Sequence, residues 1–84
     1  MNNQIFRIQQ QHLVLESTGE IIPEKEPVFF LRALDTQALC TIRCYQATMT
    51  PGSKGWETIQ QVIDNFTTFR QENRMKMKPP SEAY

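Results

Sequence analysis

Few side chains in this 84-residue chain are suited to chemistry. Its one histidine, His12, stands far in the sequence from its two cysteines, Cys40 and Cys44. Structural zinc takes four ligands, so a carboxylate or a second copy of the chain would have to complete the set. Nucleophilic catalysis needs a nucleophile beside a base. We therefore expect reduced cysteines that fill a thin helix core, and a solvated His12. The chain is predicted to be no enzyme and to hold neither metal nor cofactor.

A glycine-containing turn before a predicted helix is a second candidate site. It places a hydroxyl, a lysine and flexible backbone at a helix N-terminus, where unpaired N–H groups favour an anion. Its spacing differs from that of a phosphate-binding loop, so an ordinary turn capped by Ser53 is the simpler interpretation. Trp56 could stack on a base, although it also begins an apolar stripe. The residues predicted to bind an anion are Ser53, Lys54, Gly55, Trp56, Arg32 and Arg43.

A third candidate is the basic stretch near the C-terminus. This stretch contains a single acidic residue, Glu72, and four basic residues: Arg70, Arg74, Lys76 and Lys78. Such a stretch could contact a phosphate backbone, but it lacks interleaved aromatic residues. Nine basic and nine acidic residues also leave the whole chain with no net charge. A solvated helix end is therefore favoured over nucleic-acid binding, and Met75 and Met77 favour adaptable protein contacts.

The first part of the chain has the composition of strands. Residues 4–9 and 12–16 are rich in β-branched and aromatic side chains, and turn-forming residues follow them. Residues 28–34 are almost continuously apolar, which predicts a strand buried on both faces. Only Arg32 interrupts that run, and we expect it at the exit of the strand toward the first helix.

Two helices should follow. Asp35 is a suitable N-cap for a helix over 36–49, which contains neither glycine nor proline. Its apolar positions recur at the three- and four-residue spacing of one helix face: Ala38, Leu39, Ile42, Tyr45 and Met49. A clearer stripe predicts helix over 55–73: Trp56, Ile59, Val62, Ile63, Phe66 and Phe69.

Together these elements predict an α+β fold. A small antiparallel sheet from residues 4–34 is expected to pack against a helical hairpin of about 36–49 and 55–73. A chain of 84 residues is shorter than the usual domain of about 100–150, so residues 1–78 are predicted to form one domain and 79–84 a flexible tail. There is no apolar run long enough for a membrane span and no signal peptide, so we expect a cytoplasmic protein.

One stretch carries a resemblance. The run Glu26-Pro27-Val28-Phe29-Phe30-Leu31-Arg32-Ala33-Leu34-Asp35 precedes the two predicted helices and a Lys-Pro tail. It resembles the E-P-x-F-x-L-R-A-x-D strand-to-helix signature of a group of short, uncharacterised bacterial and phage-encoded proteins. The likeness covers roughly residues 26–80, although the second helix lacks part of that group's charged pattern. It implies a similar architecture and a mobile-element origin, and it implies no particular activity.

Three functions remain open from the sequence. The leading expectation is an interaction module, encoded by a phage or prophage, that inhibits a host factor by binding it. The alternatives are a module that sequesters a nucleotide-like anion and a weak nucleic-acid binder. A homodimer is also expected, because Phe66 and Phe69 lie in late turns of the second helix, and Phe29 and Phe30 point to opposite faces of the predicted strand.

Overall fold

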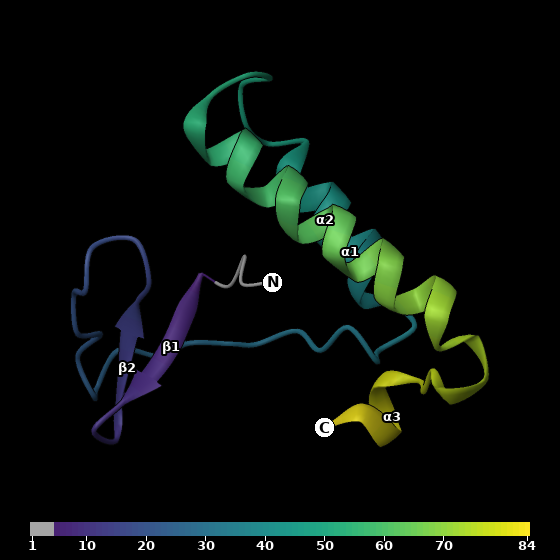
Figure 1. Cartoon of the computed structure of the whole chain (residues 1–84), viewed down its shortest axis with the longest axis horizontal. Helices are drawn as coiled ribbons and strands as arrows, with labels where there is room; N and C mark the ends of the chain where they lie inside the picture. Colours follow the sequence, from purple (N-terminus) through teal and green to yellow (C-terminus); the bar gives the residue numbers. More distant parts are fainter. Residues whose placement is uncertain (1–4) are drawn as a thin grey trace. The chain divides into compact units, whose positions relative to one another are not determined.

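The computed structural model describes residues 5–84 and separates the chain into two compact units, Met1–Phe30 and Leu31–Tyr84. The first contains a pair of antiparallel strands and the second contains the helices (Figure 1). The predicted α+β class is confirmed.

The first unit is built on a β-hairpin. Strand β1 (Phe6–Gln9) pairs antiparallel with strand β2 (His12–Leu15). The two residues between them, Gln10 and Gln11, have φ angles of 52° and 68°. Positive φ at both central residues is the mark of the mirror-image turn whose twist matches a two-stranded ribbon. An isolated antiparallel bridge adds a short third segment, because Val14 pairs with Ile21.

The predicted strand over residues 28–34 does not form. These residues lie in no regular element, and the side chains of Val28, Phe29 and Phe30 are 44%, 78% and 51% exposed. A strand needs a neighbour for its backbone N–H and C=O groups, and the sheet of the described residues ends at the bridge of Ile21. The predicted sheet is therefore shorter than 4–34, and residue 4 lies outside the described part.

The second unit is a helical hairpin, as predicted. Helix α1 (Ala38–Gln46) and helix α2 (Lys54–Glu72) lie side by side with opposite directions (Figure 1). Their buried apolar side chains are Ala38, Leu39, Ile42, Ile59 and Ile63. Helix α1 is shorter than predicted at both ends, whereas α2 matches its prediction within one residue at each end.

The sequence prediction is wrong at one position of the apolar stripe of α1. Tyr45 was expected in the core but is 56% exposed, and its neighbour Gln46 is 9% exposed instead. The Gln46 amide donates to the carbonyl of Trp56 at 3.2 Å and to Oε1 of Gln60 at 2.9 Å. Because its polar atoms are bonded across the hairpin, this glutamine is buried without an unpaired amide.

The segment predicted as a flexible tail is folded. A 3₁₀ turn, η1 (Arg74–Lys76), follows α2, and a short helix, α3 (Pro80–Ala83), follows it. Ala83 is 2% exposed, so this segment packs onto its own unit. Lys78 forms a parallel bridge with Asp35. The tail is ordered because its backbone finds partners beside the start of α1.

Candidate functional site

A hollow lies at the C-terminal end of α2. Its volume is about 570 Å³, and it is lined by Thr36, Leu39, Thr67, Arg70, Gln71, Arg74 and Met77. The hollow exists because α2 has 19 residues and α1 only nine. The last turns of α2 therefore extend past the start of α1. There they lie beside Thr36, which precedes α1, and Met77, which follows α2. We call this feature the arginine hollow.

Three of the lining residues come from one stripe of α2, and a fourth comes from the turn after it. Thr67, Arg70 and Gln71 stand at positions i, i+3 and i+4, which share one face of a helix, and Arg74 begins η1. The sequence prediction included both arginines but missed the threonine and the glutamine. That polar spacing was the signal that could have found them. Thr36, Leu39 and Met77 are brought to the hollow by tertiary structure alone.

A network of hydrogen bonds fixes the rim beside α1. Backbone bonds join Thr36 N to Lys78 O at 2.9 Å and Lys78 N to Leu34 O at 3.0 Å. The hydroxyl of Tyr84 donates to Oδ2 of Asp35 at 3.0 Å. We call these contacts, with those of Arg32 below, the C-terminal clasp. The clasp holds Thr36 and Met77 on neighbouring backbone segments and so shapes one side of the hollow.

Asp35 is the buried centre of this clasp. It is 4% exposed, and its Oδ1 accepts the backbone N–H of Gln37 at 2.8 Å. Gln37 itself is the N-cap residue of α1 and makes no side-chain cap bond. The prediction that Asp35 is the N-cap is therefore wrong, because its carboxylate accepts an N–H that precedes the first helical turn, although both of its oxygens have donors.

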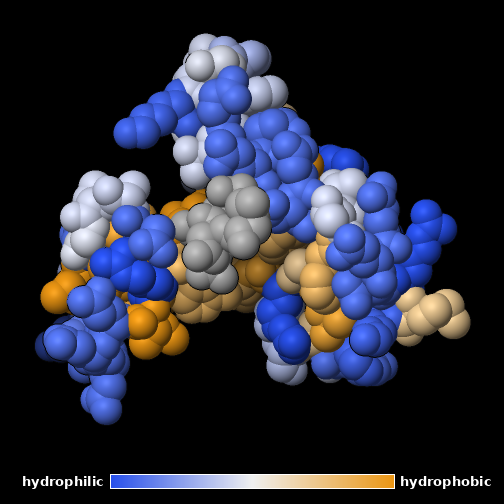
Figure 2. Space-filling view, viewed as in Figure 1, coloured by the Kyte–Doolittle hydropathy of each residue, from blue (hydrophilic) through white to orange (hydrophobic). Residues whose placement is uncertain are grey.

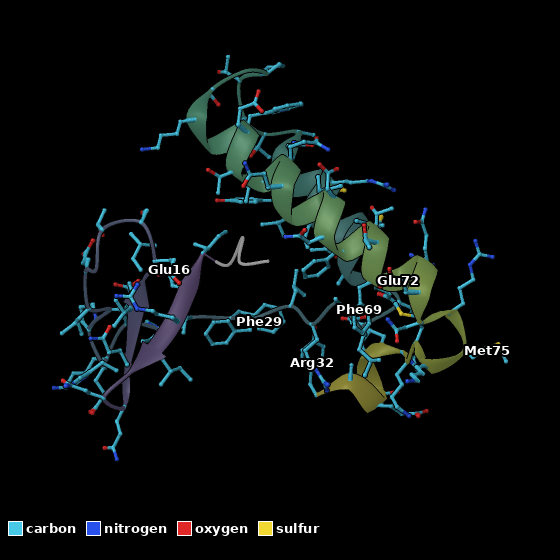
Figure 3. All side chains as sticks on the ribbon, in the orientation of Figure 1. Glu16, Phe29, Arg32, Phe69, Glu72 and Met75 are labelled. Atoms are coloured by element: carbon cyan, nitrogen blue, oxygen red, sulfur yellow. The ribbon has the colours of Figure 1, made fainter. Side chains whose placement is uncertain are left out.

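Arg32 belongs to the clasp and not to an anion site. Its Nη1 donates to the carbonyl of Ala83 at 2.7 Å, and its backbone N–H donates to the Tyr84 hydroxyl at 2.8 Å. Figure 3 shows its side chain directed to the α3 turn. The expectation that Arg32 would join Ser53 in binding an anion is wrong, because these residues lie at opposite ends of the hairpin. A 19-residue helix separates those ends by roughly 28 Å.

The turn before α2 is an ordinary helix start. Ser53 Oγ accepts the backbone N–H of Trp56 at 3.2 Å, which confirms the predicted cap. Trp56 is half-buried, while Lys54 and Gly55 are exposed. Arg43 is also exposed, on α1. The Ser53 hydroxyl thus serves as the cap of α2.

The cysteines are not core residues. Cys40 and Cys44 are both free thiols with exposed side chains, so the expectation that they fill the helix core is wrong. The two cysteines lie on the exposed face of α1, whereas Ala38, Leu39 and Ile42 lie on its buried face. His12 is exposed on β2, as expected. In residues 5–84, no three His, Cys, Asp or Glu side chains come together as a metal site.

The first unit presents apolar side chains to solvent. The register places Phe6 opposite Leu15 and Ile8 opposite Leu13, so all four share one face of the hairpin. Ile8 is 80% exposed, and the ring of Phe30 packs edge-on against Phe6 with the centroids 6.2 Å apart. Figure 2 shows apolar atoms at the surface of this unit.

Comparison with known proteins gives no relative. No family model matches the chain, and neither the curated proteins nor the solved structures yield a match. Within residues 5–84, no helix has both the length and the apolar character that crossing a bilayer requires.

Proposed function

We propose that this protein is a non-enzymatic interaction module that binds another protein through the apolar face of its β-hairpin. The observation that carries this proposal is the exposure of Ile8 on a face whose other members are Phe6, Leu13 and Leu15. Exposed apolar patches of more than a few hundred Å² mark contact surfaces in soluble proteins. A face of four large apolar side chains, one of them almost fully exposed, has the composition of an interface centre.

The segment after the hairpin adds to this surface. Phe30 contacts Phe6, and the neighbouring Val28 and Phe29 are 44% and 78% exposed. Phenylalanine is enriched at the centre of protein interfaces, where burial of its ring contributes most. The predicted strand was expected to bury these rings in the fold. Their exposure instead supports a role in contact with a partner.

The resemblance of residues 26–80 implies a mobile-element origin, which supports a proposal for the kind of partner. Because the similar proteins are encoded by bacteria and phages, we propose that the partner is a host factor in the cytoplasm, which binding inhibits. Nucleotide sequestration is less favoured, because Arg32 bonds to Ala83 and Tyr84 at the other end of the hairpin from Ser53. Nucleic-acid binding is less favoured as well, because the chain has no net charge and no aromatic side chain lines the arginine hollow.

Capture from an extract of the cell that encodes the chain tests this proposal. Ile8→Lys should abolish recovery of the wild-type partner, because it places a charge in the centre of the apolar face. His12→Lys is the matched control, since His12 is exposed on the opposite face of the same hairpin. A partner that is lost equally with both variants, or retained with both, would contradict the proposed surface.

A second copy of the chain is an alternative partner. Phe66 and Phe69 on α2 are half-buried, so part of each ring remains available for contact. Light scattering at micromolar concentration measures the mass directly, and a homodimer gives twice the 9.8 kDa of the chain. Dimer formation through α2 predicts that Phe69→Glu halves that mass. A wild-type mass of one chain, unchanged in Phe69→Glu, would exclude the homodimer.

A further inference from the structure

We propose that the arginine hollow binds an acidic peptide segment of the partner, with carboxylates on Arg70 and Arg74 and an apolar side chain on Leu39 and Met77. This inference rests on the proposed function, since it names the chemistry of the partner. It concerns a different surface from the hairpin face, so the two can be tested separately.

The polar side of the hollow is suited to carboxylates. Arg70 and Arg74 are exposed, and neither forms a salt bridge within residues 5–84, where the ion pairs are Arg7–Glu16 and Lys78–Glu82. The guanidinium group presents parallel N–H donors that match both oxygens of a carboxylate. Arg70 on α2 and Arg74 in η1 both line the hollow and can therefore bind two acidic side chains, or one from both sides.

The neighbouring polar groups complete the donor set. Thr67 donates its hydroxyl to the carbonyl of Ile63 at 2.8 Å, so it offers the hollow an acceptor only. Gln71 contributes an amide that can donate, and Thr36 contributes a hydroxyl. The donors of the hollow thus outnumber its acceptors, which favours a ligand rich in oxygen. Glu72, the acid nearest in sequence, does not line the hollow.

The rest of the hollow favours a peptide over a nucleic acid. The half-buried Met77 supplies apolar surface beside Leu39, which is only 7% exposed, and methionine adapts to side chains of different shape. None of the lining residues is aromatic, so bases would find no ring on which to stack. A net charge of +2 in residues 31–84, from seven basic and five acidic residues, attracts an acidic segment without the strong field of a phosphate-backbone binder.

The hollow is also prepared for binding by the fold. The C-terminal clasp holds Thr36 and Met77 through backbone bonds of 2.9 and 3.0 Å between residues 34–36 and 78. The side chain of Asn73 donates to the carbonyl of Phe69 at 2.9 Å and closes the end of α2 between the two arginines. A rim that is ordered before binding loses less freedom when the ligand arrives.

The test uses the full chain and a defined probe. The probe is a fluorescein-labelled, capped peptide Glu-Leu-Glu-Glu-Phe-Glu, and its dissociation constant is measured by fluorescence anisotropy at low salt. The double variant Arg70→Gln and Arg74→Gln should weaken binding by about tenfold or more, because the charge-assisted bonds are lost. Arg43→Gln is the matched control, since Arg43 is an exposed arginine of α1 outside the hollow. It should leave the dissociation constant within about twofold, because the Arg43 guanidinium does not line the hollow.

Two further probes separate the alternatives. The same peptide with glutamine in place of every glutamate should bind far more weakly, and a single-stranded oligonucleotide of equal charge should not compete. The proposal is overturned by equal loss in the Arg43→Gln control, by no binding of the acidic peptide, or by tighter binding of the oligonucleotide. Circular dichroism of each variant confirms that the helices are intact. Because the probe needs no natural partner, failure here leaves the Ile8→Lys experiment unaffected.

Discussion

Removal of the Tyr84 hydroxyl is the most direct perturbation of the C-terminal clasp. Tyr84→Phe deletes one oxygen, which donates to Oδ2 of Asp35 at 3.0 Å and accepts the backbone N–H of Arg32 at 2.8 Å. The aromatic ring and its packing remain. The variant therefore measures what these two bonds contribute to the stability of the unit formed by residues 31–84.

The magnitude follows from the burial of the two partners. A hydrogen bond to a charged group contributes about 1.5–3 kcal/mol, and Asp35 is only 4% exposed. Tyr84, however, is 58% exposed, so water can replace part of the lost donor. We therefore expect Tyr84→Phe to lower the free energy of unfolding by about 1–2 kcal/mol. Asp35→Ala should cost more, because it also removes the acceptor for the N–H of Gln37.

Urea unfolding followed by tryptophan fluorescence provides the assay. Trp56 is the single tryptophan and lies on α2, so it reports on the helical unit. Tyr45→Phe is the matched control, because Tyr45 has a nearly equal exposure of 56% and lies on α1 away from the clasp. Its effect should stay within about 0.5 kcal/mol, the usual range for a surface substitution.

A double-mutant cycle decides whether the clasp acts as described. The cycle of Asp35→Ala and Tyr84→Phe should give a coupling energy of about 1 kcal/mol, since the two side chains share a hydrogen bond. The reasoning is refuted if Tyr84→Phe is no more destabilising than Tyr45→Phe. It is also refuted if the two substitutions at the clasp are additive, because independent sites show no coupling.

Two further predictions concern the helices. Ser53→Ala should lower the free energy of unfolding by about 1 kcal/mol, because the N–H of Trp56 loses its acceptor. Ser53→Asp should retain the stability, because a carboxylate can accept the same N–H. Thermal unfolding measures both variants, and an unchanged midpoint in Ser53→Ala would contradict the cap. Cys40 and Cys44 should both react with an aromatic disulfide reagent in the folded protein, because their thiols are exposed. Labelling that begins only on unfolding would show that the thiols are covered.

The sequence by itself determined the local structure of the helical unit. The apolar stripe of α2 and the cap at Ser53 predicted a helix that the structure confirms within one residue at each end. These features are readable because a helix bonds its own backbone, and its apolar spacing records which face is buried. The α+β class and the two strands of the hairpin followed from the same short-range signals.

Only the tertiary structure decided where the remaining residues lie. Residues 28–34 have the composition of a buried strand, but a strand depends on a neighbour elsewhere in the chain, and among the described residues the sheet contains only β1 and β2 while Lys78 bonds to Leu34 alone of these residues. The last residues appeared free to move because their partners, Asp35 and Arg32, stand about fifty positions earlier. The arginine hollow has the same origin, since α2 supplies Thr67, Arg70 and Gln71, η1 supplies Arg74, and tertiary contacts bring Thr36, Leu39 and Met77. Local patterns specify an element, but long-range pairing decides what the element faces.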